Sequence, residues 1–211
     1  RLDLINRLST NEVNSLEKHQ GIKTILTTDK GRFVDIVTLY NFGGFVFAPC
    51  SFNNSKNVLS HLDKYTIMDD FRPTNMTGTH ETILFYGSEV NTFAEELFSV
   101  ELNNLNNNDF SIYVDDDKHS IAAANDDLFG GFYFVYAKED KSYWQEKIFD
   151  IDVINKFDLQ EVTSEQVNTQ RIEFGIPAVG KEITELINPL ECGLNKYVSF
   201  TKGCYIGQEV I

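Results

Sequence analysis

The most restrictive feature of this sequence is a pair of β-branched, apolar runs separated by a short polar turn. The runs are GIKTILTT (Gly21 to Thr28) and RFVDIVTLY (Arg32 to Tyr40), joined by Asp29-Lys30-Gly31. This pattern predicts a β-hairpin. Both faces of the second run are largely apolar, so the hairpin needs cover on both sides. Asp35 is then a carboxylate among hydrophobic neighbours and needs a partner or a function.

Strand and helix patterns follow the hairpin without strict alternation. Gly44 to Pro49 predicts a third strand, and Ser55 to Lys64 predicts a helix with Ser55 as its N-cap. The same reasoning predicts strands over 80–87, 110–116, 119–125 and 130–140, and helices over 89–100, 141–149 and 164–174. Gly175 and Pro177 would end the last helix. Antiparallel strands with interspersed helices indicate an α+β fold.

Composition narrows the classes of partner. The 211 residues are 42% hydrophobic, which is enough for a sizeable core, and the net charge of -14 opposes nucleic acid because no basic stripe offsets it. No apolar run is long enough to span a bilayer, and the first residues lack the apolar core of a signal peptide, so neither a membrane nor a secretory route is predicted. We expect a cytosolic or organelle-matrix protein that continues beyond Ile211, because the chain ends within an apparent strand.

The three cysteines, Cys50, Cys192 and Cys204, are widely and irregularly spaced, with no Cys-x-x-Cys pair. This spacing indicates reduced thiols rather than a disulfide framework or a zinc site. The four histidines are scattered as well, and no metal site is predicted.

The segment KGCYIGQE (Lys202 to Glu209), called the signature segment below, is the strongest candidate for chemistry. Alternation of apolar and polar residues from Val198 to Thr201 predicts a strand that ends just before it. Cys204 would then lie at a strand end beside the cation of Lys202, which favours a thiolate. A small buried cysteine in a turn is an equally good interpretation of the residues alone.

Within the signature segment the neighbours of Cys204 suit a binding loop. Gly203 and Gly207 permit close backbone approach or positive φ, while Gln208 and Glu209 offer hydrogen-bonding groups to a polar ligand.

The signature segment resembles the K-G-C-[FY]-x-G-Q-E motif of YgfZ-type folate-binding proteins, which are relatives of the glycine-cleavage T-protein. RIEFGIP (Arg171 to Pro177) and NPLECGL (Asn188 to Leu194) resemble two more family segments in the same order, and the first 13 residues and the hairpin resemble its opening. The resemblance implies a T-protein-like fold with two ferredoxin-like subdomains, which we expect at about 49–110 and in the remainder of 1–211. A C-terminal β-barrel would follow after this chain.

The resemblance also implies tetrahydrofolate as cofactor, with Arg171 matching a folate-associated arginine. In the T-protein an acidic pair lies in the hairpin strand, and here the first acid falls on Asp35 and the second on Ile36. The glutamate of a Gly-x-Glu motif falls on Tyr133. A shift of one residue turns a strand side chain to the opposite face, so Asp35 does not simply replace the missing acid.

Three functions remain open on this basis. The leading hypothesis is a YgfZ-type role in iron-sulfur cluster assembly or repair, with cluster-assembly or client proteins as partners and with Cys204 as the functional thiol, supported by Lys202, Gln208 and Glu209. The alternative is a tetrahydrofolate-dependent aminomethyltransferase in which Asp35 reaches the pocket through a local β-bulge. The third is a folate-sensing or structural protein without chemistry.

Overall fold

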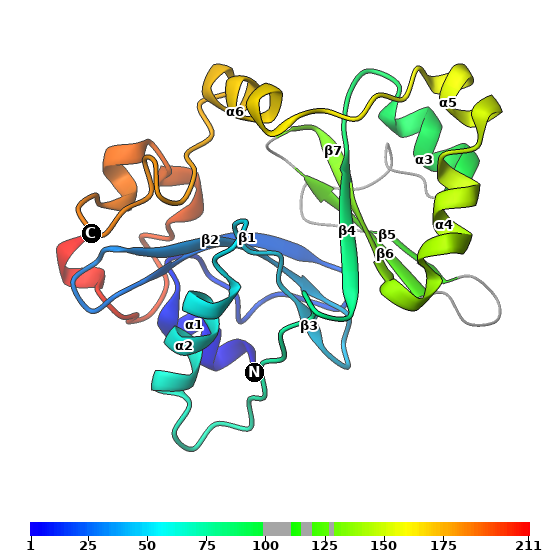
Figure 1. The fold of residues 1–211 in the computed structure, drawn as a ribbon. Coiled ribbons are helices and arrows are strands. Elements are labelled where there is room, and N and C mark those ends of the chain that lie inside the picture. Colours follow the sequence, from blue (N-terminus) through cyan, green and yellow to red (C-terminus); the bar gives the residue numbers. More distant parts are fainter. Residues whose placement is uncertain (99–110, 115–119, 127–128) are drawn as a thin grey trace. The chain divides into compact units, whose positions relative to one another are not determined.

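The computed structural model describes residues 1–98, 111–114, 120–126 and 129–211 (Figure 1). These residues form two compact units. The first unit comprises Arg1–Asn75 and Pro177–Ile211, and the second comprises Met76–Ile176. The unit boundaries therefore differ from the expected division at about 49 and 110, and residue 110 lies outside the described residues. The segment after residue 49 stays with the first unit because the helix that follows packs on the first sheet.

The first unit contains a three-stranded antiparallel sheet in the order β1-β2-β3. Its strands are β1 (Gly21–Thr27), β2 (Phe33–Asn41) and β3 (Val46–Phe47). The predicted hairpin is confirmed, whereas the third strand is shorter than the predicted 44–49. Leu26 pairs with Asp35 but Thr27 pairs with Phe33, so Val34 is the extra residue of a β-bulge directly before Asp35.

Two helices supply the apolar cover of this sheet, α1 (Leu2–Leu8) and α2 (Ser55–Tyr65), and Figure 1 shows both beneath the strands. Their buried side chains and those of the sheet form one cluster: Leu4, Ile5, Leu8, Val58, Leu62, Leu26, Val34, Val37 and Leu39. Helix α2 was predicted, although its N-cap is Asn54 rather than Ser55. Helix α1 was not predicted, because it is only seven residues long and has no side-chain cap.

The second unit contains a four-stranded antiparallel sheet in the order β4-β7-β6-β5. Its strands are β4 (His80–Phe85), β5 (Ser111–Val114), β6 (Ser120–Asp126) and β7 (Gly131–Ala137). Strands at these positions were predicted. Gly131, the second residue of the double glycine and the first of β7, has a steric role: a Cβ atom on it would lie 1.9 Å from the Phe85 carbonyl oxygen.

The helices of the second unit are α3 (Val90–Phe98), α4 (Lys141–Ile148), α5 (Ile151–Phe157) and α6 (Ser164–Glu173). Aromatic side chains dominate the core, which contains Val90, Phe93, Ala94, Phe132, Phe134, Tyr136, Trp144 and Ile148. Helix α6 begins with a capping box between Thr163 and Gln166, so the cap is Thr163 and not the predicted Ser164. It ends as predicted at Gly175, which has φ +66°.

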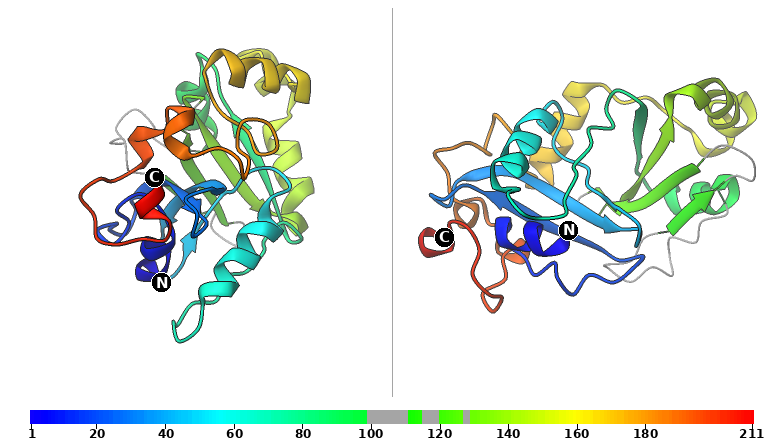
Figure 2. Two further views of the ribbon diagram at one scale, coloured as in Figure 1. Left: turned by 90° about the vertical axis from the view of Figure 1, so that its left-hand side faces the viewer. Right: turned by 90° about the horizontal axis from the view of Figure 1, so that it is seen from below.

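The remaining regular segments are short 3₁₀ helices: η1 (Lys138–Asp140), η2 (Pro189–Cys192), η3 (Asn195–Tyr197) and η4 (Gln208–Val210). Figure 2 shows the last three wound around the N-terminal part of the first unit. The strand predicted over 198–201 does not form. Its Ser199 amide instead donates to the Thr10 carbonyl oxygen at 2.9 Å, a single contact rather than a ladder. No helix formed by the described residues is long and apolar enough to cross a membrane.

Candidate functional site

The signature segment is tied to the N-terminal part of the chain while its cysteine remains exposed. The Ile206 amide donates to the Arg7 carbonyl oxygen at 2.9 Å, and Thr27 Oγ1 donates to the Ile206 carbonyl oxygen at 2.9 Å. Tyr205 is buried, whereas Cys204 is exposed and carries a free thiol. The alternative of a buried cysteine is therefore wrong, and the loop presents the thiol to solvent.

Lys202 is buried. Among the residues that the structure describes, its ammonium group donates hydrogen bonds only to backbone carbonyl oxygens. Its Nζ donates to the carbonyl oxygens of Asn6 at 2.7 Å, Ser9 at 2.9 Å and Asn11 at 2.6 Å. Burial lowers the pKa of Lys202 to about 8. The negative charge of Glu12 has the opposite effect and limits this decrease. The sequence predicted this ammonium beside the thiol, whereas in the structure it points to the last turn of α1 and the residues that follow it.

Gly207 has a steric role. Its φ is +76°, and a Cβ atom here would lie 2.4 Å from the Thr28 carbonyl oxygen and 2.7 Å from the Gly31 nitrogen. The signature segment and the hairpin turn therefore contact each other directly at Gly207 and Gly31. Nothing lies within 4 Å of the corresponding position on Gly203, so that glycine leaves open space beside Cys204.

The two polar residues at the end of the signature segment, Gln208 and Glu209, differ in their hydrogen bonding within the protein. Gln208 closes the local turn, because its Oε1 accepts from the Tyr205 amide at 3.3 Å. Glu209 is exposed and has no hydrogen bond or ion pair with the residues that the structure describes. Of the two predicted ligand-binding side chains, Glu209 is thus the freer one.

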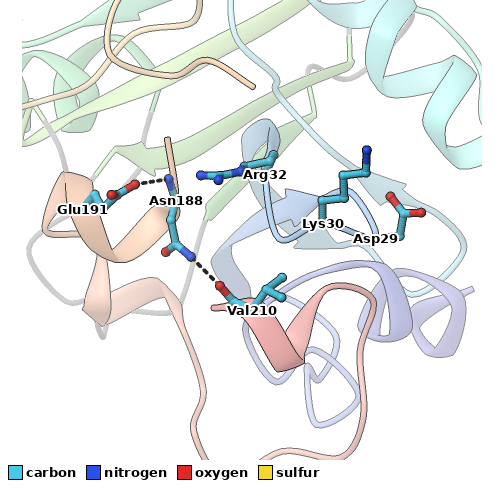
Figure 3. A pocket seen from close by; sticks show the side chains of 6 residues that line it. All are labelled: Asp29, Lys30, Arg32, Asn188, Glu191 and Val210. Atoms are coloured by element: carbon cyan, nitrogen blue, oxygen red, sulfur yellow. Dashed lines mark hydrogen bonds between the residues drawn. The ribbon is translucent and has the colours of Figure 1, made fainter. Parts of the chain in front are cut away.

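A cavity of about 440 Å³ lies where the hairpin turn meets the end of the chain (Figure 3). Its lining residues are Asp29, Lys30, Arg32, Asn188, Glu191 and Val210. Asn188 is held by both its side chain and its backbone. Its Nδ2 donates to the Val210 carbonyl oxygen at 2.9 Å, and its backbone N–H donates to Glu191 Oε2 at 2.6 Å. Arg32 Nη1 donates to the Leu186 carbonyl oxygen at 2.9 Å. The hairpin turn at 29–32 and residues 188–191 therefore form one mixed-charge surface.

Asp35 is completely buried, and its carboxylate accepts three hydrogen bonds. Oδ1 accepts from the Ile36 amide at 2.8 Å and from Ser51 Oγ at 2.6 Å, and Oδ2 accepts from the Ser51 amide at 3.0 Å. Burial raises the pKa of Asp35 despite these hydrogen bonds, and burial together with the Asp35 charge raises the pKa of Cys50 to about 11. Asp35 thus holds the loop that leads into α2, although a β-bulge does precede it.

Arg171 lies in the second unit, near the end of α6, and is also buried. Its Nε donates to Asn168 Oδ1 at 2.9 Å and its Nη1 to the Ile176 carbonyl oxygen at 3.1 Å. These bonds fasten the helix end to the chain that leaves it. They also fix the direction of the guanidinium.

The structure therefore brings Lys202, Gly203, Cys204, Gly207, Gln208 and Glu209 together with the hairpin turn in the first unit. The Asp35 carboxylate is instead hydrogen-bonded to Ser51 and to the Ile36 amide. Sequence reasoning missed Ser51 and the carbonyl acceptors of residues 6–11, and backbone acceptors have no signal in side-chain identity. Within the described residues, no group of three or more His, Cys, Asp or Glu is arranged to hold a metal ion.

Comparison with known proteins gives a consistent relationship along the whole chain. No protein-family model matches the sequence. The chain is 24% identical over 214 residues to an aminomethyltransferase of Alkaliphilus oremlandii, covering 98% of this chain and 56% of that protein. It is 22% identical over 216 residues to the aminomethyltransferase of Thermoanaerobacter pseudethanolicus, covering 99% of this chain and 57% of that protein. The chain thus spans somewhat more than half the length of these relatives.

A solved structure extends this relationship to the fold. The crystal structure of the glycine cleavage system aminomethyltransferase T from Bartonella henselae matches with a TM-score of 0.76 and 14% identity. The match covers 99% of this chain and 56% of that one. The chain therefore has the α+β fold of this aminomethyltransferase T structure, and it is similar in sequence to aminomethyltransferases along nearly its whole length.

Proposed function

We propose that this chain is the folate-binding part of a tetrahydrofolate-dependent protein of the T-protein superfamily, and that its reaction class is aminomethyl transfer. The observation that carries this proposal is the match to aminomethyltransferases along nearly the entire chain, in sequence and in fold. This support is stronger than the support for an iron-sulfur role, which rests on the signature segment alone.

The described residues fit recognition of folate better than they fit acid catalysis on it. Folate carries carboxylates as well as amide and amino groups. In the second unit the Arg171 guanidinium is chemically suited to a carboxylate, and in the first unit the exposed Gln208 and Glu209 are chemically suited to N–H donors. Tetrahydrofolate, when bound, would accept the one-carbon unit. No carboxylate is available to it from β2, because Asp35 is buried against Ser51 and the neighbouring position is Ile36.

A second candidate is favoured by Cys204. An exposed, unpaired thiol on an anchored loop suits contact with a partner protein or with an iron-sulfur cluster as cargo. In this proposal folate binding is retained, and cluster-assembly or client proteins are the partners. The committed state of Asp35 favours this candidate over an aminomethyltransferase that uses Asp35.

A glycine-cleavage exchange assay with the complete protein and the other system components separates the two candidates. Aminomethyl transfer predicts turnover that requires tetrahydrofolate and survives Cys204→Ala. No turnover, together with a loss of cluster-enzyme activity in cells that carry Cys204→Ala but not Cys192→Ala, would favour the second candidate. If neither activity depends on the protein while folate still binds, the protein is a folate sensor without chemistry.

A further inference from the structure

The contacts of Lys202 saturate its hydrogen-bonding capacity. An ammonium has three N–H donors, and Lys202 Nζ makes three bonds of 2.6 to 2.9 Å to three different carbonyl oxygens. No N–H is left to donate to the Cys204 sulfur. Any effect of Lys202 on Cys204 therefore does not involve a direct hydrogen bond between them.

The three acceptors belong to one short stretch at the end of α1. Asn6 lies in the last turn of that helix, whose final carbonyl groups lack partners within the helix, and Ser9 and Asn11 follow it. A cation is favourable at a helix C-terminus. The Lys202 side chain therefore joins two segments that are almost 200 residues apart in the sequence.

Two further groups act on the Lys202 ammonium. The Tyr205 ring lies 5.1 Å from Nζ, and Glu12 is the charged group that acts on it. Cys204 lies between the buried Lys202 and the buried Tyr205 and is itself exposed. The two buried neighbours hold the backbone on either side of the thiol.

We infer that Lys202 is a positioning residue whose three-carbonyl clamp on residues 6–11 holds the Cys204 loop in place and so sets how the thiol is presented. The lysine does not serve as a counterion to the thiolate. The inference holds for either proposed function, because it concerns only the reactivity of Cys204.

The test compares Lys202→Met, Lys202→Gln and the control Lys196→Met in the complete protein. Lys196 is an exposed lysine on η3 in the same part of the chain, so its variant loses the same charge without the clamp. Two readouts are measured: hydrogen exchange of the Ser199 and Ile206 amides, and the pH profile of Cys204 alkylation by iodoacetamide, followed on the Cys204 peptide.

The clamp predicts at least tenfold faster exchange of both amides in Lys202→Met, with the β1–β2 amides and the Lys196→Met variant unchanged. Lys202→Gln, which keeps two N–H donors, should fall between. Cys204 should be alkylated severalfold faster in Lys202→Met, with the same pH midpoint. Unchanged exchange, or slower alkylation with a raised midpoint, would overturn the inference, because the latter is the behaviour of a lost counterion.

A measurement on the wild-type protein covers the case in which both variants fail to fold. Reductive methylation under native conditions should modify Lys202 at least tenfold more slowly than Lys196, because its donors are bonded and buried. Equal rates would show that the clamp does not persist in solution.

Discussion

The two units of the chain bury different kinds of side chain. The second unit has an aromatic core in which Phe134 and Trp144 pack edge to face with ring centroids 5.1 Å apart. In the first unit the apolar cluster is accompanied by many buried polar groups, namely Asn6, Ser9, Thr10, Thr24, Thr27, Asp35, Asn54 and Lys202, whereas the described part of the second unit has Asp140 and Arg171. Apolar and aromatic packing dominates the second unit, while directed hydrogen bonds place the loops of the first.

This contrast coincides with how each unit is assembled from the chain. The second unit is one continuous segment, and the first joins the two ends of the sequence. Hydrogen bonds with fixed partners, such as Thr10 Oγ1 to the Tyr197 carbonyl oxygen at 2.6 Å, specify how the distant ends align. We therefore expect the candidate site in the first unit to be sensitive to polar substitutions and the second unit to cavities.

The largest effect is expected from Trp144→Ala in the second unit. Trp144 is fully buried, and loss of its ring should cost about 3–5 kcal/mol of unfolding free energy. Hydrogen exchange should show lost protection in β4 and β7 with β1 and β2 retained. The half-exposed Phe149→Ala serves as control. Equal loss of protection in both sheets would mean that the two units unfold together, and it would contradict the proposed difference between them.

A smaller loss is expected from Asp35→Ala. Removal of the carboxylate leaves the Ser51 amide and hydroxyl without their acceptor, which should cost about 1–3 kcal/mol in urea unfolding. Asp29→Ala on the exposed hairpin turn should be within about 0.5 kcal/mol of wild type. Asp35→Ala that retains full stability but abolishes turnover would instead identify Asp35 as catalytic.

Gly207→Ala should destabilise the contact between the signature segment and the hairpin. Its left-handed conformation alone costs a non-glycine residue about 1–2 kcal/mol, and the Thr28 carbonyl oxygen must also move. Gly203→Ala, directly before Cys204 and in open space, should be neutral in the same thermal unfolding experiment. Two equally tolerated alanines would contradict the glycine-to-glycine contact.

The smallest effect concerns reactivity rather than stability. Because burial and the Asp35 charge raise the pKa of Cys50 to about 11, its thiolate is scarce at pH 8 and its alkylation should keep rising up to about pH 11. Asp35→Asn removes the negative charge and should move this profile to lower pH. A Cys50 profile with a midpoint near 8.5 in the wild-type protein would contradict the predicted environment.

Local patterns predicted the fold well, and long-range polar contacts account for what they missed. The hairpin, α2 and most strands of the second unit have periodic apolar residues and turn signals close by. The short α1 and the 3₁₀ turns have weak local signals, and the strand expected over 198–201 is replaced by contacts to Thr10. The motif identified Cys204 as a candidate, but it did not predict the partners of Lys202, because backbone carbonyls carry no residue-specific pattern.

The central claim, folate binding by a T-protein-like chain, is tested most directly by calorimetric titration of reduced tetrahydrofolate into the complete protein. Parallel titrations use Arg171→Ala and Cys204→Ala. A folate-binding protein should give a saturable heat in the wild-type titration, which Arg171→Ala weakens and Cys204→Ala leaves intact. Absence of binding in all three proteins would contradict it and would leave a thiol-bearing scaffold without folate.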